Sequence, residues 1–218
     1  MGSLLAQVLP LAAGAAISPA LLTLQLLTLA KGGAAVKRAW AIAAGAGVVL
    51  LVEAVMALSL AESTGGSGTA PDWKSAVKLA AAVALVLVGI RNLTKAPAPP
   101  KKEDAPERGT GAARSFGLGV VLMATNVTTL ALYFPMVHEI STDDASLGAK
   151  AVVFAIAFAI VMIPAAGPPL LVTVLGERSK AGLDRMNVFV TAHHQAINAA
   201  VCFLFALVLG VPALRDLL

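Results

Sequence analysis

Six apolar stretches divide the sequence, and their length constrains the fold more than any other feature. They cover about residues 4–30, 39–61, 73–93, 116–139, 150–175 and 191–212. A helix needs about 20 apolar residues to cross a hydrocarbon layer of about 30 Å. Charged residues make up only 13% of the chain, which is about half of their usual share in a soluble domain. Each stretch is therefore predicted to be a transmembrane helix of an all-α integral membrane protein.

The positions of the basic residues predict how these helices are oriented. The first, third and fifth connections, with their helix ends, hold 12 of the 16 Lys and Arg residues. The other four, Lys74, Lys78, Lys150 and Arg215, fall on the opposite side. The positive-inside bias then puts both termini outside a cytoplasmic membrane. The net charge of +4 is assigned to contact with anionic headgroups of the cytoplasmic leaflet, and not to binding of nucleic acid.

The sequence divides into two halves of three helices each. Residues 94–115 carry four prolines among mixed charges and predict a disordered, basic cytoplasmic linker. This linker separates a first half, residues 1–93, from a second half, residues 116–218. Ser18-Pro19 in the first half and Thr125-Asn126 in the second lie at matching positions. Because a unit of three spans reverses direction when it is repeated, we predict an inverted repeat, as in many secondary transporters.

A short amphipathic segment near residues 177–190 precedes the sixth stretch. Leu183, Met186 and Val190 share one of its faces, and charged residues take the other positions. Such a segment can lie in the headgroup plane. It can equally be an extension of the sixth helix, and the sequence leaves both interpretations open.

Proline breaks inside the apolar stretches are the first candidates for a transport pathway. A proline in a helix removes a backbone hydrogen bond and leaves a carbonyl free to meet a ligand. Ser18 and Pro19 mark such a break in the first stretch. In the fifth stretch, the three prolines between Pro164 and Pro169, among them Pro168, are expected not to fit one regular helix. The alternative for both is a purely structural kink.

Polar side chains inside the apolar stretches are the second group of candidates. Glu53 is the only acid well inside a stretch, so we expect it to be protonated, paired or facing a cavity. Asn126, Thr129 and Tyr133 share one face of the fourth stretch. The predicted pathway residues of this group are Gln25, Glu53, Asn126, Thr128, Thr129, His194 and Asn198. The alternatives are hydrogen bonds between helices for the residues of the fourth stretch, a position at the outer interface for Glu53, and a position at the membrane interface for His194.

The sequence contains no motif that supports catalysis or a metal site. It has no nucleophile–base pair, and its single cysteine, Cys202, rules out an internal disulfide. His138 and the pair His193-His194 fall at opposite membrane faces in the predicted topology, so one metal cannot bind both. We therefore expect neither an enzyme nor a cofactor. Without a nucleotide-binding domain, transport would run on a gradient or be powered by a partner.

Several short motifs spread over most of the chain carry a family resemblance. They are Ala16-Ile17-Ser18-Pro19, Gly117-Leu118-Gly119, the run from Asn126 to Leu132, Gly176-Glu177-Arg178 with Leu183-Asp184-Arg185, and His193-His194-Gln195-Ala196-Ile197. With these motifs the chain resembles the sulfolipid-addressing and peptidoglycolipid-addressing membrane proteins, a branch of the lysine exporter superfamily. That family usually has Asn-Pro-Lys-Asn where this chain has Asn126-Val127-Thr128-Thr129. Arg178, His193 and His194 are candidates to replace the missing positive charge in contact with a lipid headgroup.

The resemblance implies six helices and a role in moving envelope glycolipids across the cytoplasmic membrane. Our first hypothesis is therefore an exporter or flippase-like transporter of a lipid or glycolipid. One alternative is a proton-coupled exporter of small amino acids or cations. Another is a non-transport scaffold subunit of an envelope-lipid export complex. A homodimer, or association with such a complex, is the expected protein partnership.

Overall fold

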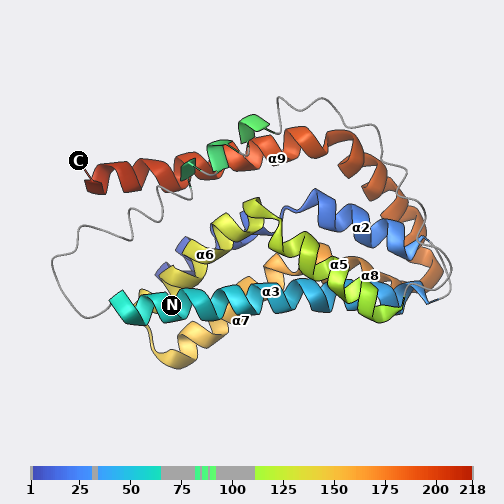
Figure 1. Ribbon diagram of the computed structural model, residues 1–218, viewed down its shortest axis with the longest axis horizontal. Helices are drawn as coiled ribbons and strands as arrows, with labels where there is room; N and C mark the ends of the chain where they lie inside the picture. The colour runs from blue at the N-terminus through green and yellow to red at the C-terminus, as the bar shows by residue number, and fades with distance from the viewer. Residues whose placement is uncertain are drawn as a thin grey trace.

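The computed structural model describes residues 2–30, 34–64, 82–83, 85–87, 89–91 and 111–217, and within them every regular element is a helix (Figure 1). The elements are α1 (Gly2–Ala15), α2 (Pro19–Leu29), α3 (Ala35–Thr64), α5 (Ala112–Ala124), α6 (Val127–Thr142), α7 (Leu147–Val161), α8 (Ile163–Leu175), the 3₁₀ helix η1 (Gly176–Ser179) and α9 (Lys180–Leu217). The all-helical prediction is confirmed for this part of the chain.

Three of the predicted spans are bent sharply in the middle. The bend is 56° between α1 and α2, 74° between α5 and α6, and 73° between α7 and α8. Within the described ranges, α3 is the one continuous helix long and apolar enough to cross a membrane, over Ala35–Ser59. If each bent pair counts as one span, the number rises to four. The chain is thus a membrane protein, whereas six spans, their orientation and the inverted repeat stay predictions.

The remaining two predicted stretches are described only in part. Most of residues 73–93 lies outside the described residues, apart from short helical pieces between residues 82 and 91. Helix α9 covers the sixth stretch, and it begins at Lys180. Residues 180–190 of the amphipathic segment therefore belong to one continuous helix with that stretch. In this segment Leu183 is buried and Arg185 is exposed.

The bend between α7 and α8 corrects one expectation about proline. All three prolines lie in the single helix α8, and the bend precedes them, at Met162. Pro164 occupies the first turn, where a missing N–H costs nothing because those N–H groups have no partner inside the helix. Pro168 and Pro169 lie inside the helix. The expectation that the three do not fit one regular helix is therefore wrong, although the sharp bend itself is present.

The helices of the two predicted halves pack mainly against each other. Helix α1 packs on α6 and α7, α2 on α8 and α9, and α3 on α5, α6 and α8. In Figure 1, α3 runs along the length of the molecule, and α5 and α6 meet at an apex beside it. One buried cluster joins side chains of both halves, including Leu4, Leu50 and Met136. The linker predicted at 94–115 thus joins sequences that share one core, and α5 already begins at Ala112 within it.

Two glycines let the backbones of α3 and α5 touch. A Cβ atom at Gly45 would collide with the carbonyl oxygen of Phe116, and one at Gly119 with that of Ile42. By contrast, a Cβ at Gly117 would meet no atom within 4 Å. Small residues at a helix crossing permit this close approach in membranes. The crossing fixes α5, and therefore the start of its bend into α6, against the straight helix α3.

Candidate functional site

The first two bends meet inside the bundle through their capping residues. Ser18 is the N-cap of α2, and Asn126 is the N-cap of α6. The Asn126 side-chain Nδ2 donates a hydrogen bond to Ser18 Oγ at 2.8 Å. Asn126 Oδ1 accepts from the backbone N–H of Thr129 at 3.3 Å, which satisfies one of the open donors at the start of α6. The N-terminal ends of two half-helices, one from each predicted half, therefore lie together.

Two threonines complete this site, which we call the polar crossing: Ser18, Asn126, Thr128 and Thr129. Pro19 has no N–H to pair with the carbonyl of Ala15, four residues earlier. The Thr129 hydroxyl donates to this carbonyl at 3.0 Å. Thr128 Oγ1 lies 3.7 Å from Cys202 Sγ on α9. All four side chains of the polar crossing therefore have partners, and three of them are buried, with Asn126 half-buried.

Gln25 satisfies a second carbonyl that a proline leaves free. Pro169 removes the N–H that would pair with the Ala165 carbonyl, and Gln25 Nε2 donates to that oxygen at 2.6 Å. The same nitrogen donates to the Ala39 carbonyl at 3.0 Å. Gln25 is 0% exposed, yet its Oε1 has no hydrogen-bond partner among the described residues. An orphaned buried acceptor costs about 1–3 kcal/mol, so Oε1 is a position where a donor would be stabilised.

The half-buried acid of α3, Glu53, lies on a helix that packs against α6, which carries part of the polar crossing. Glu53 is half-buried, and its Oε2 has no hydrogen-bond partner in the described part of the chain. Tyr133 lies on α6, which packs against α3. Its ring is fully buried, and its hydroxyl likewise lacks a described partner. The sequence places Tyr133 on the face of Asn126 and Thr129, but it was not among the predicted pathway residues, and that shared face was the signal for it.

The polar groups follow one another along the bundle. Gln25 lies seven residues after Ser18 on α2, which is about 10 Å along the helix axis. Tyr133 lies seven residues after Asn126 on α6, at a similar distance on the other side of the polar crossing. Both spacings are two helical turns, so each pair lies on one face of its helix. Gln25, the polar crossing, and Tyr133 with Glu53 thus form a series of polar positions.

The other predicted site residues lie apart from this series or outside the described residues. Pro164 and Pro168 are buried within α8. Arg178 on η1 and His193 on α9 are exposed, as contact with a headgroup requires. The His193 ring packs against Phe189 with 4.8 Å between ring centroids. The side chains of His194 and Asn198 lie outside the described residues.

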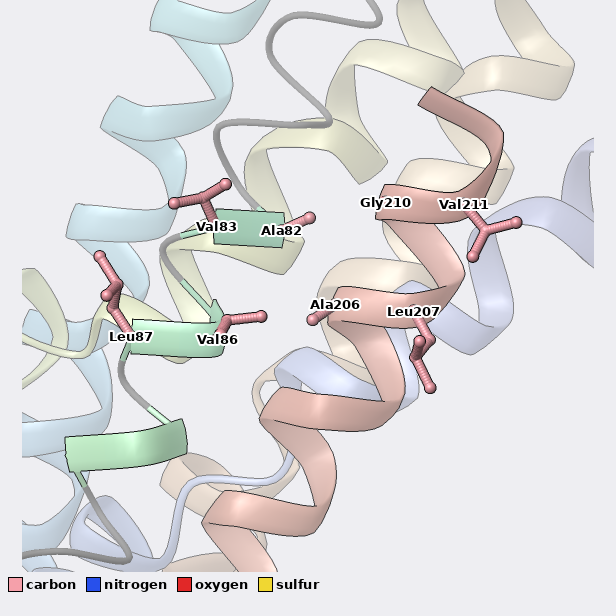
Figure 2. A pocket seen from close by; sticks show the side chains of 8 residues that line it. All are labelled: Ala82, Val83, Val86, Leu87, Ala206, Leu207, Gly210 and Val211. Atoms are coloured by element: carbon pink, nitrogen blue, oxygen red, sulfur yellow. The ribbon is translucent and has the colours of Figure 1, made fainter. Parts of the chain in front are cut away.

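An apolar groove lies between α9 and the helical pieces of the third stretch. Its volume is about 330 Å³, and its lining is Ala82, Val83, Val86, Leu87, Ala206, Leu207, Gly210 and Val211. Figure 2 shows Ala82 and Val86 pointing toward α9 across this groove. Because no lining side chain is polar, the groove offers hydrocarbon contacts and no hydrogen bonds.

The comparisons with known proteins bear on the whole chain. No curated protein and no solved structure matches it. The family model described as Sap, sulfolipid-1-addressing protein, matches residues 8–214. The match extends from α1 to α9 and includes the polar crossing, Gln25 and Glu53, and it confirms the resemblance to sulfolipid-addressing proteins. The protein belongs to the family of Sap, the sulfolipid-1-addressing protein.

Proposed function

We propose that the protein transports a lipid or glycolipid of the cell envelope across the cytoplasmic membrane, as an exporter or flippase. The observation that carries this proposal is the hydrogen bond between Asn126 and Ser18, which joins two broken helices at a buried polar site. Discontinuous helices that meet near the midplane are the usual binding sites of secondary transporters. The family is named for addressing sulfolipid-1, and this name favours a lipid as the cargo over a water-soluble solute.

The chemistry of the polar crossing suits a sugar headgroup. Each hydrogen bond in it joins a hydroxyl or amide to a partner that a headgroup hydroxyl can replace, so that binding exchanges hydrogen bonds and does not abolish them. The N-termini of α2 and α6 also favour negative charge through the helix dipole. An anionic glycolipid headgroup would therefore pass the polar crossing, while its tails stay in the hydrocarbon.

A transfer assay with purified protein tests this proposal. Liposomes containing the protein receive a headgroup-labelled fluorescent sulfoglycolipid in one leaflet, and an impermeant quencher measures its arrival in the other. Asn126→Ala and Thr129→Val are expected to slow transfer about tenfold each, because a buried hydrogen bond contributes about 1–1.5 kcal/mol. Ser59→Ala, an exposed hydroxyl on α3, is the matched control and is expected to transfer at the wild-type rate.

Two results would contradict the proposal. The first is wild-type protein that transfers the labelled lipid no faster than protein-free liposomes. The second is Asn126→Ala and Thr129→Val transferring at the wild-type rate, which would remove the polar crossing from the pathway.

A proton-coupled exporter of small solutes, the mode of transport expected from the lysine exporter superfamily, is the second candidate function. Glu53 favours it, because an acid inside the bundle is what coupling to protons or cations requires. Uptake of labelled lysine and other small amino acids into the same liposomes separates the two functions. Solute flux without lipid transfer would support this alternative and contradict lipid transport.

A further inference from the structure

Glu53 and Tyr133 are two ionisable groups that the polar crossing does not use. Glu53 Oε2 and the Tyr133 hydroxyl oxygen are buried, and neither has a hydrogen-bond partner among the described residues. The two residues lie on helices that pack against each other, Glu53 on α3 and Tyr133 on α6. Buried polar groups without partners are rare in folded proteins, and those that occur call for a functional explanation.

We propose that Glu53 and Tyr133 form a proton-binding site that couples a proton gradient to the opening of the polar crossing. This inference rests on the proposed function, because it supplies the energy source for that same transport. Glu53 is the group that binds the proton, and Tyr133 is a positioning residue that transmits its state.

The protonation state of Glu53 determines whether its carboxyl group needs a hydrogen bond from the Tyr133 hydroxyl. A carboxylate in a low-dielectric interior is costly unless it accepts hydrogen bonds, and the Tyr133 hydroxyl is a buried donor without a described partner on the helix that packs against α3. A protonated carboxyl group is neutral and needs no such donor. Loss of the proton therefore draws the Tyr133 hydroxyl, and α6 with it, toward α3, whereas protonation releases them.

The position of Tyr133 on α6 carries this movement to the polar crossing. Tyr133 lies one turn beyond Thr129 and two turns beyond Asn126 on the same face of α6. Those two residues hold the bonds from α6 to the Ala15 carbonyl and to Ser18 Oγ. A shift of α6 toward α3 pulls on both bonds at once. The protonation state of Glu53 thus biases the polar crossing between its closed form and a form with free hydrogen-bonding groups.

No other titratable group of the described helices that pack on α3 competes for this role. Helices α2 and α8 carry none. Helix α5 carries only Arg114, in its first turn, near the first half of α3. Helix α6 carries His138 and Glu139, five and six residues beyond Tyr133 and off its face. Among these helices, Tyr133 is therefore the titratable partner of Glu53.

The site lies toward the predicted outer side of the membrane. Glu53 follows the start of α3 by 18 residues, which is about 27 Å of helix rise from the predicted cytoplasmic end. A proton from outside binds the Glu53 carboxylate, and its later loss toward the cytoplasm draws α6 to α3 and opens the polar crossing. Inward movement of one proton is thereby exchanged for outward movement of lipid, with no bond in the lipid broken.

The lipid-transfer assay with an imposed pH gradient tests this coupling. A gradient of about one pH unit, with the predicted outer side acidic, is about a tenfold difference in proton activity. Wild-type transfer is expected to accelerate up to about tenfold, whereas Glu53→Gln and Tyr133→Phe are expected not to respond to the gradient. Asp144→Asn, which changes an exposed acid between α6 and α7, is the matched control and is expected to respond like wild type.

Infrared spectroscopy of the purified protein tests proton binding without any cargo. A buried protonated carboxyl group gives a C=O band that disappears as the pH is raised. This band is expected in wild type, Asp144→Asn and Tyr133→Phe, and it is expected to be missing in Glu53→Gln. Tyr133→Phe therefore keeps the bound proton and loses only the gradient response, which a merely structural role for Tyr133 does not predict.

The outcomes distinguish this inference from the proposed function. Lipid transfer by wild type at one rate with and without the gradient would overturn the coupling and leave lipid transport intact. An unchanged gradient response in Glu53→Gln would do the same. If wild type transfers no lipid, the proposed function fails, and the infrared band alone decides whether Glu53 binds a proton.

Discussion

The close contact between the backbones of α3 and α5 predicts that an added methyl group destabilises the protein. A matched pair of substitutions measures this packing cost. At Gly119 a new methyl group would collide with the Ile42 carbonyl, whereas at Gly117, on the same helix, it would enter open space. Both substitutions to Ala improve helix propensity by the same amount, up to about 1 kcal/mol. The difference in stability between Gly119→Ala and Gly117→Ala is therefore the packing cost alone.

The size of this cost follows from the geometry. Carbon needs about 3.5 Å to its nearest heavy neighbour, so α3 and α5 must move apart by about 1 Å to admit the methyl group. Overpacking of this kind costs about 1–3 kcal/mol. Because 1 kcal/mol corresponds to about 2–4 °C in a chain of this size, Gly119→Ala is expected to unfold about 2–12 °C below Gly117→Ala.

Thermal unfolding in detergent micelles, followed by circular dichroism at 222 nm, measures this difference. The same comparison applies to α3, where Gly45 meets the Phe116 carbonyl and Gly47 has only ordinary contacts with Met162 and Phe158. The double variant Gly45→Ala with Gly119→Ala is expected to lose less than the sum of the two, since one separation of the helices accommodates both methyl groups. Equal unfolding temperatures for Gly119→Ala and Gly117→Ala would refute the close crossing.

Three further predictions concern the hydrogen bonds at the helix breaks, each measured by unfolding in sodium dodecyl sulfate. Gln25→Leu is expected to lower the free energy of unfolding by about 1–3 kcal/mol, since it leaves a buried carbonyl without a donor; a loss below about 0.5 kcal/mol would contradict this role. Pro169→Ala returns an N–H that can pair with the Ala165 carbonyl, so the double variant with Gln25→Leu is expected to recover part of that loss. Strictly additive changes in the free energy of unfolding would contradict this pairing. Asn126→Ala is expected to cost about 1–2 kcal/mol as a lost helix cap, and more than Asn126→Asp, which keeps the cap but not the donor to Ser18.

Local chemistry is what the sequence predicts well in this chain. The break at Ser18-Pro19 follows from proline alone, because a missing N–H and a fixed backbone angle act within a few residues. The apolar stretches likewise predict helices over the right parts of the chain. In the fifth stretch the same argument predicts a bend but misplaces it, since Pro168 and Pro169 stay helical while the bend lies at Met162.

Contacts between distant residues account for what the sequence does not predict. The fourth stretch breaks at Thr125 without a proline, because Asn126 both caps α6 and binds Ser18, 108 residues away. That Ala165 has a free carbonyl follows from proline chemistry, but only the packing of α2 on α8 shows that Gln25 fills it. Tyr133 shares the face of Asn126 and Thr129 in the sequence, but only the packing of α6 on α3 brings it to the helix of Glu53.

The Ala15 carbonyl, which Pro19 leaves without a helical donor, also has a consequence for the order in which the chain is synthesised and inserted. Its donor, Thr129, lies in the second half of the sequence, so the first half enters the membrane before that donor exists. An unpaired carbonyl in hydrocarbon costs several kcal/mol, and because Pro19 offers it no N–H in any geometry, this cost persists until Thr129 on α6 arrives. Two separately produced halves would therefore each expose one partner of this hydrogen bond, the Ala15 carbonyl on one and the Thr129 hydroxyl on the other, and forming the bond favours their association.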